Sequence, residues 1–202
     1  MICLGFAIFF LRKKAVGYWY GFVYLLFVIV VIEAIGWRMS ILHIKNHWLY
    51  NIELLIECLF LAWFFSKEIK AFGVSNLGIK ISAFVFIISF LLEAFQSQFL
   101  DYADKTDSLA SLLLVIASGI YFYLLLKHTE YVNLFTHPTF WLMAGIFFFY
   151  FGSTSVNIFF NELMNINIAG GVPLRYIIFT ILNAILYGCW CYSFRCKYLQ
   201  AI

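Results

Sequence analysis

Long apolar segments decide the fold, and the clearest of them, residues 18–37, has the sequence YWYGFVYLLFVIVVIEAIGW. Among these side chains only Glu33 is charged. A helix of about 20 residues rises about 30 Å, which is the thickness of the hydrocarbon core of a bilayer. Residues 18–37 are therefore predicted to form a transmembrane helix.

The same pattern recurs along the chain and predicts an all-α transmembrane bundle of seven helices in a single domain, residues 1–202. Residues 2–11 have only about half the length needed to cross the bilayer, so the first helix is expected to be a short, partial span. The full spans are expected at 18–37, 48–65, 79–99, 109–126, 140–160 and 176–194.

The composition excludes a soluble protein. Hydrophobic residues make up 65% of the 202 residues and charged ones 11%, whereas soluble domains average about 45–50% and about 25%. The 25 Phe, 13 Tyr and 6 Trp, with only 2 Pro, also exclude a disordered chain, collagen and a coiled coil. The net charge of +3 is small and scattered, so nucleic acid is not an expected partner. The lipid bilayer is the expected one.

The segments that connect the predicted spans alternate along the chain between one side of the membrane, which is rich in basic residues, and the other side, which has few. By the positive-inside rule, the side with more Lys and Arg is cytoplasmic. This predicts a multi-pass protein of the inner (plasma) membrane, with its N-terminus outside and its C-terminus in the cytoplasm. The cytoplasmic side holds nine of the 13 basic residues, namely Arg12, Lys13, Lys14, Lys67, Lys70, Lys80, Lys127, Arg195 and Lys197.

Polar side chains inside the spans are the candidate functional residues, because a charge at the centre of a membrane helix costs roughly 2.5–3.5 kcal/mol. Counted at 1.5 Å per residue, they lie about 6–14 Å below the outer ends of their helices. Tyr50, Glu53 and Glu57 share one helix face. We predict an outward-facing polar cavity with these ligand-binding residues: Glu33, Glu53, Glu57, Glu93, Gln96, Asn157, Asn161, Asn183 and, near the mouth, Arg175.

Two other interpretations of these residues stay open. The glutamates and amides can simply hold helices together by hydrogen bonds. His43 and His47, four residues apart and close to Glu53, are weak candidates for metal ligands. The GxxxG pair Gly17 and Gly21 and the pair Ala184 and Gly188 favour close helix packing, either within the chain or between protomers. No cofactor and no catalytic residue is predicted, since GxSxG, HExxH and phosphate-loop motifs do not occur in the sequence.

Three stretches carry a resemblance to a known group: YNIELLIE at 50–57, FWLMAGI at 140–146 with Gly152 following, and ILNAILY at 181–187. In order and spacing they resemble uncharacterised bacterial seven-span membrane proteins, similar to the membrane sensor regions of some histidine kinases. The resemblance implies a seven-helix bundle with a sensing role, and no ligand or residue role transfers with it.

Three hypotheses for function follow. The leading one is a membrane protein that binds a small or amphipathic ligand in the outward cavity and signals through helix movement to a protein partner or a second copy of the chain. The alternative is a proton- or cation-coupled carrier in which Glu57 and Glu93 titrate. The third is an intramembrane hydrolase or transferase that uses the glutamates as acid and base.

Overall fold

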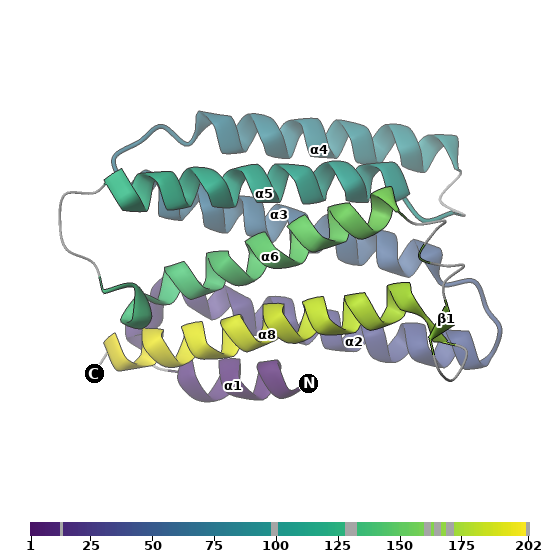
Figure 1. Ribbon diagram of the computed structural model, residues 1–202, viewed down its shortest axis with the longest axis horizontal. Coiled ribbons are helices and arrows are strands. Elements are labelled where there is room, and N and C mark those ends of the chain that lie inside the picture. Colours follow the sequence, from purple (N-terminus) through teal and green to yellow (C-terminus); the bar gives the residue numbers. More distant parts are fainter. Residues whose placement is uncertain are drawn as a thin grey trace. The chain divides into compact units, whose positions relative to one another are not determined.

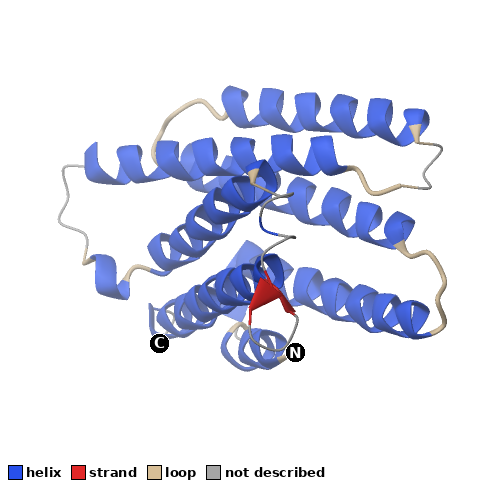
Figure 2. Cartoon of the chain, turned by 45° about the vertical axis from the view of Figure 1, so that its right-hand side comes forward, coloured by secondary structure: helices blue, strands red, loops and turns tan. Residues whose placement is uncertain are grey.

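The protein is a bundle of α-helices. Its computed structural model describes residues 1–12, 14–97, 101–127, 133–159, 163, 167–168 and 172–200. Helices account for nearly all of these residues, and the described strands are a short antiparallel pair, β1 (Asn167–Ile168) and β2 (Val172–Pro173) (Figures 1 and 2). The predicted fold class, an all-α bundle, is confirmed.

The six predicted spans are confirmed as helices long and apolar enough to cross a membrane. The short first helix is also present, as the nine-residue α1 (Ile2–Phe10), which the 3-10 turn η1 (Lys14–Tyr20) follows. The long helices are α2 (Gly21–Ile41), α3 (His47–Ala71), α4 (Leu77–Gln96), α5 (Asp104–Lys127), α6 (Pro138–Ile158) and α8 (Leu174–Gln200).

Several helices extend past the predicted apolar limits. The end of α3 lies at Ala71 rather than at residue 65, α5 begins at Asp104 rather than at 109, and α8 continues to Gln200 rather than to 194. Charged and polar residues end a hydrophobic segment, but they do not end a helix: Lys and Glu are good helix formers, and acidic residues are favoured in a first turn. For α3, α5 and α8, the apolar pattern therefore underestimates the length of the helix.

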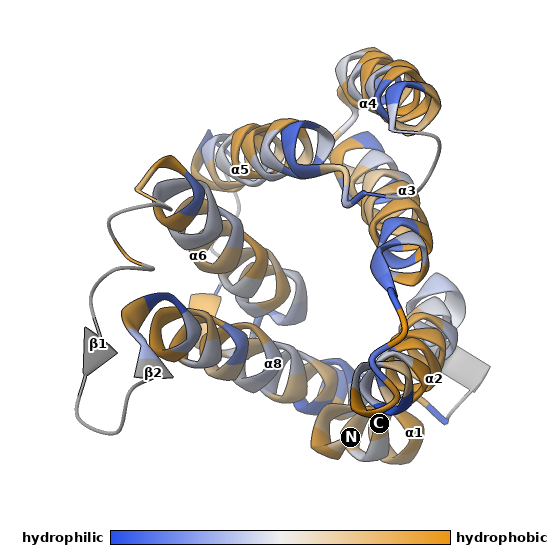
Figure 3. Ribbon diagram, turned by 90° about the vertical axis from the view of Figure 1, so that its right-hand side faces the viewer, coloured by the Kyte–Doolittle hydropathy of each residue, from blue (hydrophilic) through white to orange (hydrophobic). Residues whose placement is uncertain are grey.

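Many large apolar side chains lie on the surface of these helices. On α4, Phe84, Leu92 and Phe95 are 64%, 59% and 72% exposed, and Figure 3 shows hydrophobic residues along most of each helix. A soluble protein rarely exposes so large an apolar surface. These side chains are suited to contact lipid, which makes this a multi-pass membrane protein.

The chain forms two compact units, Met1–Ala110 and Ser111–Ile202, and each is described by itself. The first unit holds α1 to α4 and the start of α5. The second holds the rest of α5 with α6 and α8. The helix α5 is thus the continuous element that the two units share.

In the first unit, two glycines let α2 approach α3 closely. A Cβ at Gly21 would lie 2.8 Å from the Phe60 ring, and one at Gly36 would lie 2.6 Å from the Tyr50 hydroxyl. The close packing expected of Gly21 is confirmed. Gly17 has open space around it and instead breaks η1, at φ 57° and ψ −131°.

The turns that join α2 to α3 and α3 to α4 have the same design. In each, a residue with positive φ follows the helix: His43 at 54° after α2 and Gly73 at 73° after α3. Each turn then ends in an asparagine that begins the next helix and donates a hydrogen bond to a group ten residues back, Asn46 to the Gly36 carbonyl and Asn76 to the Ser66 hydroxyl. These two turns fix three consecutive helices as antiparallel neighbours.

In the second unit, α6 packs tightly against α8 through two glycines on one face. A Cβ at Gly145 would lie 2.9 Å from that of Cys189, and one at Gly152 would lie 2.5 Å from the Leu182 side chain. The pair Ala184 and Gly188, predicted from sequence to favour packing, is exposed on α8, and a Cβ at Gly188 would meet nothing within 4 Å. The glycines of α6, and not those of α8, therefore bring these helices together.

Candidate functional site

The start of α5 is held against α3 by one buried side chain. Asn51 on α3 is 2% exposed. Its Nδ2 donates a hydrogen bond to the Asp101 carbonyl and its Oδ1 accepts one from the Ala103 N–H, both at 3.0 Å. A side-chain amide has both a donor and an acceptor, so it can pair with backbone in this way. The segment that enters α5 is thereby fixed in register with α3.

Glu93 on α4 caps the same helix. Its carboxylate accepts hydrogen bonds from the Lys105 N–H at 3.1 Å, from the Thr106 N–H at 2.7 Å and from the Thr106 hydroxyl at 2.6 Å. The first N–H groups of a helix have no partners within it, and the positive end of the helix dipole favours a negative charge there. Glu93, which the sequence predicts as a ligand-binding residue, thus has a defined structural task.

Three other predicted glutamates gather on α2 and α3. Glu53 is half-buried on α3 and interacts electrostatically with Glu57, one turn along, and with Glu33 on α2. Tyr50 also interacts electrostatically with Glu33 and Glu53. Glu33 itself is exposed at the surface of the unit. We call Glu33, Glu53 and Glu57 the carboxylate cluster.

The carboxylate cluster adjoins the docked start of α5 through Tyr102. Burial raises the pKa of Tyr102 above its ordinary value of about 10, and the nearby charges of Asp107, Asp104 and Glu57, with the thiol of Cys58, raise it further. The phenol is therefore neutral at physiological pH. Glu57 thus interacts electrostatically both with Glu53 and with Tyr102.

Gln96, the remaining predicted residue of the first unit, is exposed at the last position of α4. It has no hydrogen bond to Glu93 or to the start of α5 among those the described residues make. Its predicted role in ligand binding stays a prediction.

Two of the predicted residues of the second unit, Asn183 and Arg175, contact a residue of their own helix. Asn183 donates a hydrogen bond to the Phe179 carbonyl one turn back, at 2.9 Å. The Arg175 guanidinium lies 5.3 Å from the centre of the Phe179 ring, in cation–π range. Asn157 is half-buried on α6, and Asn161 lies outside the described residues.

The candidate metal ligands lie at the surface of the first unit. His43 and His47 are both exposed, the first in the turn after α2 and the second at the start of α3. In the part of the chain that the structure describes, no group of three or more His, Cys, Asp or Glu side chains is arranged to hold a metal ion.

Glu68 is a buried carboxylate that was not among the residues predicted from the sequence. It is 7% exposed near the end of α3 and accepts a hydrogen bond from the Tyr18 hydroxyl at 2.8 Å. The apolar limits of the predicted span placed it outside the helix. A signal was present, because Leu61, Phe65 and Glu68 continue a single helix face at steps of four and three. Polar groups are therefore buried toward both ends of α3.

No family model, curated protein or solved structure matches this chain.

Proposed function

We propose that this membrane protein binds a small cationic ligand at the carboxylate cluster and responds through α5. The observation that carries the proposal is the convergence of Glu33, Glu53 and Glu57 from two helices. Gathering negative charge in an apolar bundle is unfavourable unless a positive group offsets it. A bound ammonium group would relieve this repulsion.

The response is proposed to travel along α5. Its first turn is held by Asn51 on α3 and by Glu93 on α4, and Glu57 lies close to Tyr102 just before it. A cation that neutralises Glu57 changes the field at this first turn. Because α5 belongs to both compact units, a shift at its start would reach the second unit, or a protein partner that contacts it.

The orientation and location complete the proposal. The distribution of Lys and Arg supports a plasma-membrane protein with the carboxylate cluster on the outer side. The ligand would then arrive from outside the cell, as the sensing hypothesis requires.

The carrier hypothesis finds less support. It needs Glu57 and Glu93 to exchange protons during transport, whereas the Glu93 carboxylate already accepts three hydrogen bonds as the cap of α5. A carrier based on this pair would have to uncap α5 in each cycle.

Thermal unfolding of the purified chain tests the proposal. The probes are the ammonium cations choline and spermidine, each at matched ionic strength. We expect at least one of them to raise the melting temperature of the wild type, because a ligand that binds only the folded state stabilises it, by about 2.7 kcal/mol at 100 times its Kd. The same cation should slow hydrogen exchange at residues 101–107.

Glu53→Gln and Glu57→Gln should abolish this shift. Asp101→Asn is the matched control, since it removes one negative charge from an exposed side chain close to α5. A shift of equal size in Glu53→Gln and the wild type would overturn the binding site. If neither choline nor spermidine stabilises the wild type, the carboxylates act only in helix packing.

A further inference from the structure

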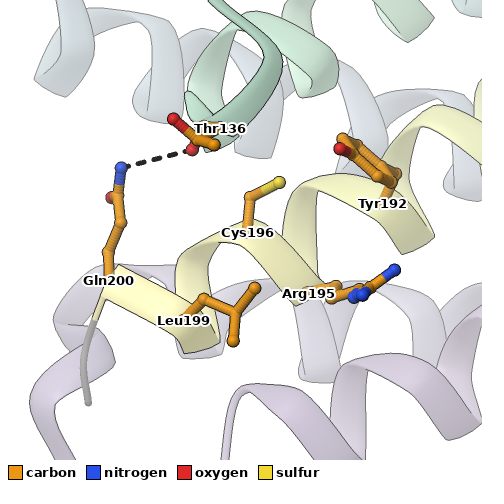
Figure 4. Close-up of a pocket in the computed structure, with 6 residues that line it drawn as sticks. All are labelled: Thr136, Tyr192, Arg195, Cys196, Leu199 and Gln200. Atoms are coloured by element: carbon orange, nitrogen blue, oxygen red, sulfur yellow. Dashed lines mark hydrogen bonds between the residues drawn. The ribbon is translucent and has the colours of Figure 1, made fainter. Parts of the chain in front are cut away.

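A pocket of about 330 Å³ lies at the C-terminal end of α8, wholly within the second unit. Its volume is at the lower end of the range of small-molecule sites, about 300–1,000 Å³. Figure 4 shows Arg195 and Gln200 on opposite sides of Cys196 and Leu199. The residues that line it are Thr136, Tyr192, Arg195, Cys196, Leu199 and Gln200.

The wall opposite α8 is the turn η2 (Leu134–Thr136), and side chains of α6 and α8 hold it in place. The Phe135 carbonyl accepts hydrogen bonds from the Tyr192 hydroxyl at 3.2 Å and from the Trp141 indole N–H at 3.1 Å. Gln200 donates to the Thr136 carbonyl at 3.4 Å, which closes one end of the pocket. The pocket is therefore shaped by specific contacts and not by a loose loop.

The charged side chains that the structure describes in this unit are all basic, which favours an anion. Its described residues include Lys127, Arg175, Arg195 and Lys197 but no Asp or Glu. Arg195 consequently has no carboxylate to pair with in the described part of its unit. A guanidinium presents a planar set of N–H donors that matches the oxygens of a phosphate.

The position of the pocket indicates where such a phosphate would come from. With 27 residues, α8 is about 40 Å long, whereas the hydrocarbon core needs about 30 Å. The end that carries Arg195 and Lys197 would therefore reach the level of the lipid headgroups. Leu199, 58% exposed beside the pocket, offers an apolar surface to an acyl chain.

We propose that this pocket binds the phosphate group of an anionic phospholipid, with Arg195 as the residue that contacts the phosphate. Basic pockets at the ends of membrane helices are suited to such headgroups. The site is separate from the carboxylate cluster, which lies in the other unit and would attract charges of the opposite sign.

Native mass spectrometry of the full chain, purified and delipidated in detergent, tests the proposal. The probes are phosphatidylglycerol, phosphatidylcholine, and phosphatidylcholine with inorganic phosphate. The wild type should retain phosphatidylglycerol in preference to phosphatidylcholine. Arg195→Gln should lower this retention about fivefold, the effect of roughly 1 kcal/mol for one basic residue at an anionic surface.

Two further variants make the result specific. Lys127→Gln removes the same charge from a residue that does not line the pocket, so it should retain phosphatidylglycerol like the wild type. Leu199→Trp fills the pocket without changing the charge, and it should lose retention as Arg195→Gln does. Helical content by circular dichroism confirms that each variant is folded.

Three outcomes would overturn the proposal. Equal retention by Arg195→Gln and the wild type would exclude Arg195 as the contact. An equal loss in Lys127→Gln would mean that net charge, and not the pocket, attracts the lipid. Retention of inorganic phosphate without any preference for phosphatidylglycerol would assign the pocket to free phosphate in place of lipid.

Discussion

Glu93 and Thr106 join α4 to the first turn of α5 through two hydrogen bonds to one carboxylate oxygen, from the Thr106 N–H at 2.7 Å and from its hydroxyl at 2.6 Å. Thr106 is fully buried, so its N–H loses its side-chain partner if this carboxylate is removed, whereas its hydroxyl still has the Ser89 hydroxyl 3.2 Å away. Substitution of Glu93 is therefore the most direct test of how the first turn of α5 is held.

Glu93→Ala should destabilise the protein by about 1–3 kcal/mol, because it leaves the buried Thr106 N–H unsatisfied and removes a helix cap. Glu93→Gln keeps one acceptor oxygen and should cost less. Melting temperature in detergent gives the ranking, and hydrogen exchange at residues 104–107 should quicken in the same order. Equal stability of wild type and Glu93→Ala would contradict the capping role.

Asn51→Ala should also cost about 1–3 kcal/mol, since the buried Ala103 N–H and the Asp101 carbonyl lose their partner together. Asn51→Asp is the informative comparison. It keeps the acceptor for Ala103 but loses the donor to Asp101, so it should remain less stable than the wild type. Unfolding in a denaturant series measures both variants, and a neutral Asn51→Ala would argue against this contact.

The two related turns predict opposite effects of substitution. His43→Gly should stabilise the protein by about 0.5–1 kcal/mol, because φ of 54° is strained for a side chain with a Cβ. Gly73→Ala should destabilise it by about 1 kcal/mol or more for the same reason. Thermal unfolding of the two single variants checks the signs. A destabilised His43→Gly would show that the imidazole has a role that outweighs the backbone strain.

Gly145 lies where α6 faces α8, and Gly188 lies on the exposed surface of α8. Gly145→Ala and Gly188→Ala therefore form a matched pair. Alanine favours a helix over glycine by up to about 1 kcal/mol. Gly188 has open space, so Gly188→Ala should be neutral or stabilising. A Cβ at Gly145 would meet the Cys189 Cβ at 2.9 Å and the Leu186 carbonyl at 3.2 Å, so Gly145→Ala should cost about 1–3 kcal/mol. Equal melting temperatures for the two variants would contradict the close approach of α6 and α8.

The folding stability of the protein should depend on pH through His137. Its Nδ1 accepts a hydrogen bond from the Phe140 N–H at 3.2 Å and so caps α6, which requires a neutral ring. Burial first, and then the charge of Lys197, lower the pKa of His137 below its ordinary value of about 6.5. The unfolded chain therefore takes up the proton first as the pH falls. Stability from this residue is present above about pH 6.5 and is lost between there and the lowered pKa.

His137→Asn tests that dependence, because asparagine also caps helices but does not titrate. Melting temperatures of the wild type and the variant are compared from pH 8 to pH 5. The wild type should lose stability relative to the variant below about pH 6.5. A constant difference across this range would exclude His137 as the titrating group.

The sequence correctly predicted the features that depend only on residues close together in the chain. Hydrophobic length predicted every long helix, and the spacing of Glu53 and Glu57 correctly predicted that they share a face and interact. It could not predict that Glu93 caps α5, since this depends on which helix begins beside α4. It also could not locate the close approach of α6 to α8 at Gly145, because one small residue looks like another until the facing helix is known.

Hydrophobic length alone establishes that this is a helical membrane protein, because about 20 consecutive apolar residues can satisfy their backbone in lipid only as a helix. The roles of the polar residues come from the folded chain. Asn51 and Glu93 serve the docked start of α5, Glu33, Glu53 and Glu57 gather as a carboxylate cluster, and Arg195 lines a pocket beside η2. In lipid a polar side chain must find its partner on another segment, and only the packing of the helices determines which segment that is.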